Sequence, residues 1–412
     1  MQKLEYTKIF GEKKLNQKIS FSISVIAIIL GALIFRLHPI FLDQLSTEKQ
    51  ENPEIFVGVT FCGNTTDQAK LLIDRVKNYT NLFVLYSGPV SKNETAMTEI
   101  SEYSIESGLS IAVYFGDLNS RILQLKNLEW RVTWIEMAKQ RWGNQFLGVH
   151  YYDEPGGIYI DHNWNETILP YNVTFNDLTY DSVANLFIKG FQRDDGFDVL
   201  EKNSVDAFVS DYALYWFDYL AGYDVVLTQV GWNHSLTQDI ALLRGAAKVQ
   251  NKSWGEMITW KYNNPPYLDS GENIYEQMRI GYECGAEYFM IFNYPSFDGN
   301  EYGTLLDEHF EALEKFWNQV VNNNEVVHDS IKAEAALVLP KNYGWGMRRP
   351  NDRIWGWWGP DEKSEQIWNI SQKLIDQYGL TLDIVYDDQT YPVNNIYPKI
   401  YFWNNTKTFS NP

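Results

Sequence analysis

The chain has 412 residues, and its hydrophobic content of 45% is enough to bury one large core. Acidic residues outnumber basic residues 53 to 34, which gives a formal net charge of -19. A surface of this charge repels phosphate backbones, so the composition argues against nucleic acid as a partner. It also repels anionic lipid, so any attachment to a lipid bilayer must come from a hydrophobic segment of the chain.

Residues 19–35 are such a segment. They read ISFSISVIAIILGALIF without a charge, about the length of a helix that crosses a bilayer core of about 30 Å. Lysines dominate the charged residues before this run, whereas acidic residues dominate those after it. This asymmetry predicts a cytoplasmic tail over 1–18, a transmembrane anchor over 19–36 and an extracytoplasmic stalk over 37–54. A cleaved signal peptide is the alternative, but no small-x-small cleavage site follows the run.

Glycosylation acceptors favour the same topology, because every Asn-x-Ser/Thr triplet of the chain lies beyond the expected anchor. Their density indicates a glycosylated surface. The triplets begin at Asn64, Asn78, Asn93, Asn165, Asn172, Asn233, Asn251, Asn369 and Asn404.

From residue 55 onward, apolar runs of strand length alternate with helical stretches, which is typical of a parallel sheet with crossover helices. The helical stretches carry apolar residues at i, i+3 and i+4 spacing, as in residues 69–76. Eight strand–helix units predict a (β/α)8 TIM barrel over residues 55–324, in the α/β fold class. The predicted strands are Ile55–Phe61, Leu82–Ser87, Ser110–Phe115, Phe146–Tyr152, Ala207–Ser210, Val225–Val230, Trp254–Trp260 and Tyr288–Phe292.

The two cysteines fall at opposite rims of this predicted barrel. Cys62 follows the carboxyl end of the first strand, and Cys284 precedes the eighth. A disulfide requires α-carbons about 6 Å apart, whereas a strand's length separates these two residues. We therefore expect two free thiols.

Residues 325–412 predict a small C-terminal α/β domain. Its expected elements are strands at Ala335–Leu339, Leu380–Tyr386 and Ile400–Trp403 and a helix at Lys363–Tyr378. The loop from Tyr343 to Trp358 reads YGWGMRRPNDRIWGWW and has two interpretations, a plug that seals this domain against the barrel or a lid that adds sugar subsites above the barrel mouth. We favour the plug, because a domain junction must bury surface.

The active site of a (β/α)8 barrel is built at the carboxyl ends of its strands, so the residues there are the first candidates. In this chain they are polar and aromatic, a mixture that suits sugars, whose CH faces stack on rings while their hydroxyls form hydrogen bonds. The expected substrate-binding residues are Tyr86, Tyr114, Asp117, Tyr152, Asp153, Gln229, Trp232, Trp260, Lys261, Asn293 and Tyr294.

The fourth strand carries the sharpest signal. It ends in His150-Tyr151-Tyr152-Asp153-Glu154-Pro155, with two acids where the proline ends the strand. Consecutive side chains of a strand point to opposite sides of the sheet, so we expect only one of the two acids to face the barrel cavity. The alternation through Gly148 and Tyr152 favours Glu154 as a general acid/base; a carboxylate that caps a loop or pairs with a lysine is the alternative.

The ending Tyr151-Tyr152-Asp153-Glu154-Pro155 resembles that of several (β/α)8 glycoside hydrolases, similar to the retaining clan A and β-galactosidase-like enzymes. The resemblance covers residues 55 to 321 and implies that a strand-four glutamate, here Glu154, is the general acid/base. The domain from Leu337 onward is also similar to the small α/β domain that follows the barrel in some β-galactosidase-like enzymes.

Retaining members of that clan carry a glutamate nucleophile at the end of the seventh strand, and here two candidates stay open for the second carboxylate. Glu256 lies on that strand, but about four residues before Trp260 and so more than about 10 Å from the mouth. Asp211, at the mouth end of the fifth strand, is the alternative, and with it an inverting arrangement becomes possible.

Other chemistries lack their motifs. The six histidines show no ligand pair, so no metal or other cofactor is expected, and no Gly-x-Ser-x-Gly elbow or phosphate-binding glycine loop occurs. The sequence therefore predicts a surface-anchored glycoside hydrolase that acts on a poly- or oligosaccharide through Glu154 and either Asp211 or Glu256. A catalytically inactive glycan-binding barrel and a structural surface protein are the alternatives.

Overall fold

The computed structural model describes residues 54–162, 164, 178–232, 234–295, 299–323, 325–404 and 408–410, without the side chains of 408–410. The predicted tail, anchor and nearly all of the stalk lie outside these residues. Within them, no helix is both long and apolar enough to cross a membrane. Six of the nine glycosylation triplets start within the described residues, and all six asparagines are solvent-exposed.

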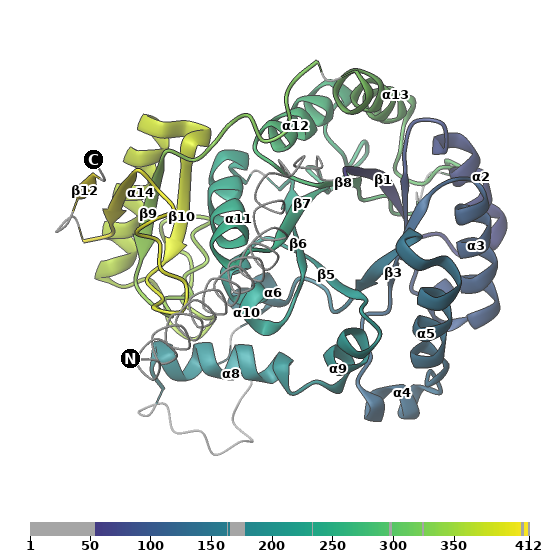
Figure 1. Cartoon of the computed structure of the whole chain (residues 1–412), viewed down its shortest axis with the longest axis horizontal. Coiled ribbons are helices and arrows are strands. Elements are labelled where there is room, and N and C mark those ends of the chain that lie inside the picture. Colours follow the sequence, from purple (N-terminus) through teal and green to yellow (C-terminus); the bar gives the residue numbers. More distant parts are fainter. Residues whose placement is uncertain are drawn as a thin grey trace, which may run out of the picture. The chain divides into compact units, whose positions relative to one another are not determined.

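Eight parallel strands close into a barrel in chain order, as the sequence predicts (Figure 1). Each strand pairs with its sequence neighbours, and β1 closes the ring against β8, with Phe56 opposite Tyr288. The observed and predicted ends differ by at most two residues. The strands are β1 Phe56–Phe61, β2 Leu82–Leu85, β3 Ser110–Tyr114, β4 Phe146–His150, β5 Asp206–Asp211, β6 Val225–Val230, β7 Ser253–Ile258 and β8 Tyr288–Ile291.

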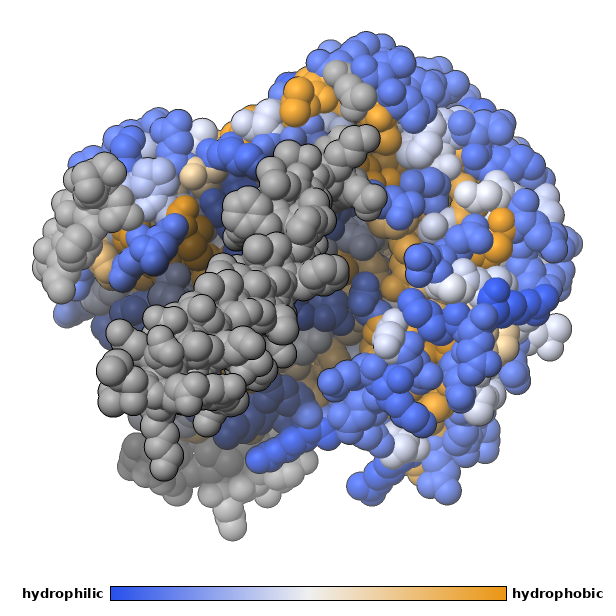
Figure 2. All heavy atoms as spheres, in the orientation of Figure 1, coloured by the Kyte–Doolittle hydropathy of each residue, from blue (hydrophilic) through white to orange (hydrophobic). Residues whose placement is uncertain are grey.

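Helices surround the barrel, and their apolar residues face the strands, which leaves a largely hydrophilic surface over α2, α3 and α5 (Figure 2). Their starts follow local capping chemistry: Thr65 and Gln68 form a reciprocal capping box at the first of them. The helices are α2 Thr66–Val76, α3 Glu94–Glu106, α4 Ser120–Lys126, α5 Trp130–Trp142, α6 Pro155–Asp161, α8 Tyr180–Gln192, α9 Asp195–Lys202, α10 Tyr215–Ala221, α11 Leu236–Gln250, α12 Gly271–Glu283 and α13 Asp307–Lys315.

Two apolar clusters fill the two sides of the barrel wall. The inner cluster contains alternate strand residues such as Phe208 on β5, Leu227 on β6 and Met257 on β7. The other alternate residues, such as Val209 and Ile258, face the helices. This period of two decides below which strand-end side chains reach the mouth.

The C-terminal sheet has the order β10-β9-β11-β12, with β12 antiparallel at its edge. It lies beside α11, which contacts both β6 and β10 (Figure 1). At this contact the buried Arg244 and Asp383 form an ion pair at 2.8 Å. The elements are β9 Ala335–Leu339, α14 Glu362–Tyr378, β10 Leu382–Tyr386, β11 Lys399–Phe402 and β12 Thr408–Ser410.

The tryptophan-rich loop between β9 and α14 supports the plug interpretation. Trp345, Trp355 and Trp357 are buried, and the ring of Trp355 lies 4.6 Å from that of Phe217 on α10. The loop therefore fills the junction between the C-terminal sheet and the barrel helices.

Both cysteines are buried and unpaired in the structure. Burial raises the pKa of each thiol to about 12. Neither thiolate would therefore form readily near neutral pH.

Candidate active site

The segment that follows β4 has an unusual backbone. Tyr152 and Glu154 both adopt left-handed conformations, with φ values of 61° and 48°, although neither is glycine. Pro155 then occupies the first position of α6. Left-handed backbone at bulky residues costs free energy and concentrates at functional sites, so this segment is the first place to look for one.

Glu154 is half-buried, and its carboxylate accepts a hydrogen bond of 2.6 Å from the side-chain amide of Gln229. Gln229 lies two residues after Leu227 on β6, so its side chain points to the same side of the strand and faces the barrel interior. Burial raises the pKa of Glu154, and the charge of Asp153 adds to this effect, whereas the bond from Gln229 opposes it. A carboxyl group in this setting can hold a proton and exchange it with a ligand.

Asp153 is solvent-exposed, and its Oδ1 accepts a hydrogen bond of 3.0 Å from the hydroxyl of Tyr86 at the end of β2. The ring of Tyr86 stacks on Tyr114 of β3, with 4.4 Å between their centroids. Although the side chain reaches solvent, surrounding protein atoms raise the pKa of Asp153, while the bond from Tyr86 lowers it. The ends of β2, β3 and β4 thus meet around Asp153.

His150 lies beside Tyr86 inside the barrel. It is fully buried with its ring 5.2 Å from that of Tyr86, and neither ring nitrogen has a hydrogen-bond partner among the described residues. Burial lowers the pKa of His150 to about 3, so the imidazole is neutral. Its place follows from the period of two that also turns Gly148 inward.

A groove of about 750 Å³ adjoins the mouth over the ends of β2 to β4, and its walls include three predicted substrate-binding residues, Tyr114, Asp117 and Tyr152. The hydroxyl of Tyr152 donates a hydrogen bond of 2.6 Å to Asp194, which fixes its ring. Arg131 supports the groove by donating hydrogen bonds to the carbonyl oxygens of Ser91, Phe115 and Asp117. No sequence motif singled out this arginine.

Aromatic side chains gather over the ends of β6 to β8. Trp260 lies 6.4 Å from Trp232, 5.3 Å from Tyr267 and 5.6 Å from Tyr294, measured between ring centroids. Trp232 is 40% exposed and Tyr294 is 39% exposed, so both offer ring surface to a ligand. Lys261 beside them is engaged in an ion pair of 2.6 Å with Asp269.

Asn293 follows the carboxyl end of β8. It is 4% exposed, and its side-chain oxygen accepts a hydrogen bond of 2.9 Å from the backbone of Thr304. That oxygen therefore ties the loop after β8 together, while Asn293 also lines a small pocket there, and its role in substrate binding stays a prediction.

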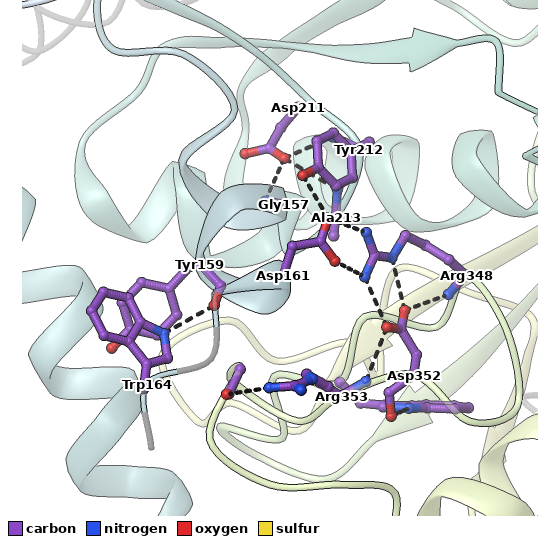
Figure 3. Close-up of polar contacts among 12 residues, drawn as sticks. Gly157, Tyr159, Asp161, Trp164, Asp211, Tyr212, Ala213, Arg348, Asp352 and Arg353 are labelled. Carbon is purple, nitrogen blue, oxygen red and sulfur yellow. Dashed lines mark hydrogen bonds and ion pairs between the residues drawn. The ribbon is translucent and has the colours of Figure 1, made fainter. Parts of the chain in front are cut away.

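Asp211 also requires a correction. It is fully buried and has the parity of Val209, so it points away from the mouth. Its two oxygens accept backbone hydrogen bonds from Gly156 at 2.6 Å and Gly157 at 2.8 Å, at the start of α6. Figure 3 shows the bond from Gly157. Tyr212 and Ala213 donate further backbone bonds to Asp211. Asp211 therefore caps the helix that begins just after Glu154 and is not positioned as a second catalytic carboxylate.

Asp218 lies buried next to Asp211. Burial raises the pKa of Asp218 well above its ordinary range, and the charge of Asp211 raises it further. Burial also raises the pKa of Asp211, to about 7, although its four backbone donors oppose this effect. The pair is part of the core beneath α6.

Glu256 requires the second correction. It is fully buried and shares the parity of Trp254 and Ile258, so it faces α12, where a side chain at Gly281 would collide with its carboxyl group. Neither of its oxygens has a hydrogen-bond partner among the described residues. Burial raises its pKa well above the ordinary value, so it is a neutral acid outside the mouth.

The opposite end of α6 is held by the C-terminal loop. Arg348 forms ion pairs with Asp161 at 2.7 Å and with the buried Asp352 at 2.8 Å (Figure 3). The hydroxyl of Tyr212 donates a further hydrogen bond of 2.9 Å to Asp161. Asp211 and Arg348 thus fix both ends of the helix that carries Glu154 at its amino-terminal cap.

The described residues contain no group of three or more His, Cys, Asp or Glu side chains that could hold a metal ion. The chemistry available at the mouth is that of carboxyl, amide and hydroxyl groups beside aromatic rings.

No family model matches the chain, and no curated protein matches it in sequence. Solved structures do resemble it. GH5_18 from Streptomyces cattleya in complex with GlcNAc has a TM-score of 0.55 at 12% identity, covering 87% of this chain and 100% of that chain. A substituted form of the same enzyme in complex with Manb1-4GlcNAc gives 0.53 at 12% identity over 86% and 100%. Alpha-L-fucosidase isoenzyme 2 from Paenibacillus thiaminolyticus gives 0.52 at 10% identity over 84% and 60%.

These similarities extend over most of the chain, including the closed barrel. The protein therefore has the fold of TIM-barrel glycoside hydrolases, a class in which the residues at the carboxyl ends of the strands form the active site. At this level of identity the similarity defines the fold, and the activity must be argued from the site itself.

Proposed function

We propose that the protein is a glycoside hydrolase in which Glu154 is the general acid/base. The observation that carries the proposal is the setting of this carboxyl group at the mouth: it is half-buried, its pKa is raised by burial, and Gln229 fixes one of its oxygens. A glycosidic oxygen leaves as a hydroxyl group only if it receives a proton, and a carboxyl of raised pKa supplies one near neutral pH.

The surroundings of Glu154 suit a saccharide of several residues. The groove beside Tyr114 and Tyr152 and the exposed rings of Trp232 and Tyr294 lie over different strand ends. Flat rings bind the CH faces of sugars, while Asp117 and Asp153 can accept hydrogen bonds from hydroxyl groups. The neighbours that contain GlcNAc and Manb1-4GlcNAc show that the same fold binds such sugars in those proteins.

A glycan-binding barrel without activity is the second candidate, and one observation favours it. Neither Asp211 nor Glu256 reaches the mouth, so the paired carboxylates of most glycosidases are not formed by the residues that the sequence suggests. Such a protein would bind oligosaccharides through the same aromatic residues without cleaving them.

Replacement of Glu154 by Gln tests the catalytic proposal. The change keeps the size of the side chain but removes the transferable proton, so hydrolysis of unactivated oligosaccharides should fall by about 100-fold or more. Binding, measured by calorimetry, should be largely kept. Glu106→Gln, at the exposed end of α3, is the matched control and should leave the rate unchanged. Full activity of Glu154→Gln would refute the assignment, and a wild type that binds but cleaves no glycan would favour the second candidate.

We also propose that residues 19–36 anchor the barrel at the outer side of a membrane, as the charge asymmetry around them suggests. The full-length protein should stay in the membrane pellet after alkaline carbonate extraction and dissolve only in detergent. A soluble product whose amino terminus lies beyond residue 36 would show a cleaved signal peptide instead.

A further inference from the structure

Asp153 and Glu154 are consecutive residues, so their carboxyl groups start from the same wall of the mouth, with α-carbons about 3.8 Å apart. A retaining double displacement needs two carboxyl groups that face each other across the sugar at about 5.5 Å, and an inverting reaction needs a wider gap. Two neighbouring side chains cannot reach both faces of one sugar ring. Asp153 is therefore badly placed to attack the anomeric carbon opposite Glu154.

The end of β7 does not supply the opposing group either. In the enzymes that the sequence resembles, a nucleophilic glutamate stands there, but this chain has Trp260 and Lys261. Residues 253–262 contain one carboxyl group, that of Glu256, and it is buried against α12. The end of β7 therefore offers no carboxylate nucleophile at the mouth.

Asp153 is well placed for a different task. Its Oδ1 is held by the hydroxyl of Tyr86, whose ring is stacked on Tyr114, while its other oxygen forms no hydrogen bond with the described residues. One carboxylate oxygen is thus fixed and the other is left for a donor on a ligand. The fully buried His150 lies against the same Tyr86, and neither of its ring nitrogens has a hydrogen-bond partner among the described residues.

We propose that the substrate supplies the nucleophile: the protein cleaves glycosides of 2-acetamido-2-deoxy sugars, with Asp153 binding the amide N–H of the acetamido group. This inference rests on the proposed function of Glu154. The acetamido carbonyl oxygen can reach the anomeric carbon only from the face opposite the leaving group, so the 2-acetamido group must be trans to that group, as it is in β-glycosides of the gluco and galacto series. The aromatic rings of Tyr86 and Tyr114 suit the methyl group of the acetamide.

Each step balances. The acetamido oxygen bonds to the anomeric carbon while the bond to the leaving oxygen breaks, and Glu154 transfers its proton to that oxygen. Asp153 stabilises the positive charge on the resulting oxazolinium ring through its N–H. Water then attacks the anomeric carbon and gives its proton to Glu154, and the bond to the acetamido oxygen opens. The product keeps its anomeric configuration, and both carboxyl groups return to their starting states.

Substrates that differ in the substituent on carbon 2 of the sugar test the inference. Methylumbelliferyl β-glycosides of N-acetylglucosamine and N-acetylgalactosamine should be cleaved at least about 100-fold faster than the 2-hydroxy analogues, because the internal nucleophile acts at a high effective concentration. N-trifluoroacetyl analogues, whose carbonyl oxygen is a weaker nucleophile, should react at least about tenfold more slowly than the acetyl compounds. NMR should show retained configuration in the first product.

Asp153→Asn tests the role of the residue itself. Its turnover of the N-acetyl substrates should fall about 100-fold, and a thiazoline analogue of the ring intermediate should bind at least about tenfold more weakly than it does to the wild type. Asp198→Asn, on the exposed side of α9, is the control and should match the wild type in both measurements. If Asp153 had only a structural role, Asp153→Asn would show the same ratio of rates on the N-acetyl and N-trifluoroacetyl substrates as the wild type. The inference predicts a smaller ratio in the variant.

Three results would overturn the inference without touching the proposed function. They are equal rates on 2-hydroxy substrates, inverted product, and a covalent adduct of the protein with a 2-deoxy-2-fluoro glycoside, which traps a protein nucleophile. Failure of the wild type to cleave any glycoside would refute both proposals together.

Discussion

Two glutamates of this protein, one after β4 and one on β7, have the same side chain and opposite surroundings. Burial raises the pKa of both. Glu154 keeps a path to the mouth and a partner in Gln229, whereas Glu256 is sealed between β7 and Gly281 of α12. A raised pKa therefore does not identify a catalytic acid by itself; access to a ligand separates the two residues.

Asp211 is a third carboxyl group, and its surroundings differ from those of both glutamates. It is as buried as Glu256, but four backbone N–H groups satisfy its oxygens. Its contribution to the site is indirect, because two of those donors belong to the first turn of the helix that follows Glu154. One carboxyl group is open to a ligand, one caps a helix and one is a neutral buried acid.

The largest effect on folding should come from Asp211→Ala. The change leaves four backbone donors near the start of α6 without their acceptor, and the free energy of unfolding should fall by about 3 kcal/mol or more. Denaturation in urea measures this quantity. Asp206→Ala, on the exposed start of the same strand, should change it by less than about 0.5 kcal/mol. Equal effects of the two changes would show that the cap of α6 is unimportant.

A smaller effect is expected from Arg348→Met, which releases the other end of α6 by removing the ion pairs with Asp161 and Asp352. Misplacement of Glu154 should lower kcat by about tenfold and leave KM nearly unchanged, because the substrate is still bound by the mouth residues. Arg349→Met changes the neighbouring exposed arginine and serves as control. If both variants keep the wild-type kcat, the C-terminal loop does not position Glu154.

The smallest effect belongs to Glu256→Gln, which should leave activity intact and change only the pH dependence of stability. The folded protein keeps a proton on Glu256 that the unfolded chain releases above its ordinary pKa of 4.5, so this group makes stability fall as pH rises from there toward the folded-state pKa. The variant should lack this contribution, about 1.4 kcal/mol per pH unit at most. Parallel stability curves for the two proteins between pH 5 and 8 would contradict the neutral, buried acid.

The sequence by itself determined the barrel. Eight apolar runs separated by amphipathic stretches recur at a spacing that leaves few other arrangements, and the observed strands differ from the predicted ones by at most two residues. It also determined that Asp153 and Glu154 follow the carboxyl end of β4, although the strand ends at His150 and Pro155 is instead the first residue of α6.

Only the tertiary structure decided which carboxyl groups reach the mouth. Asp211 and Glu256 stand on strands as predicted, but the side of the barrel wall that each faces depends on the register and parity of its strand, which a single residue can invert. The sequence likewise could not show that Arg348, 187 residues after Asp161, holds the helix that follows Glu154. Such contacts between distant segments arise when the C-terminal loop packs against the barrel, and no local pattern encodes them.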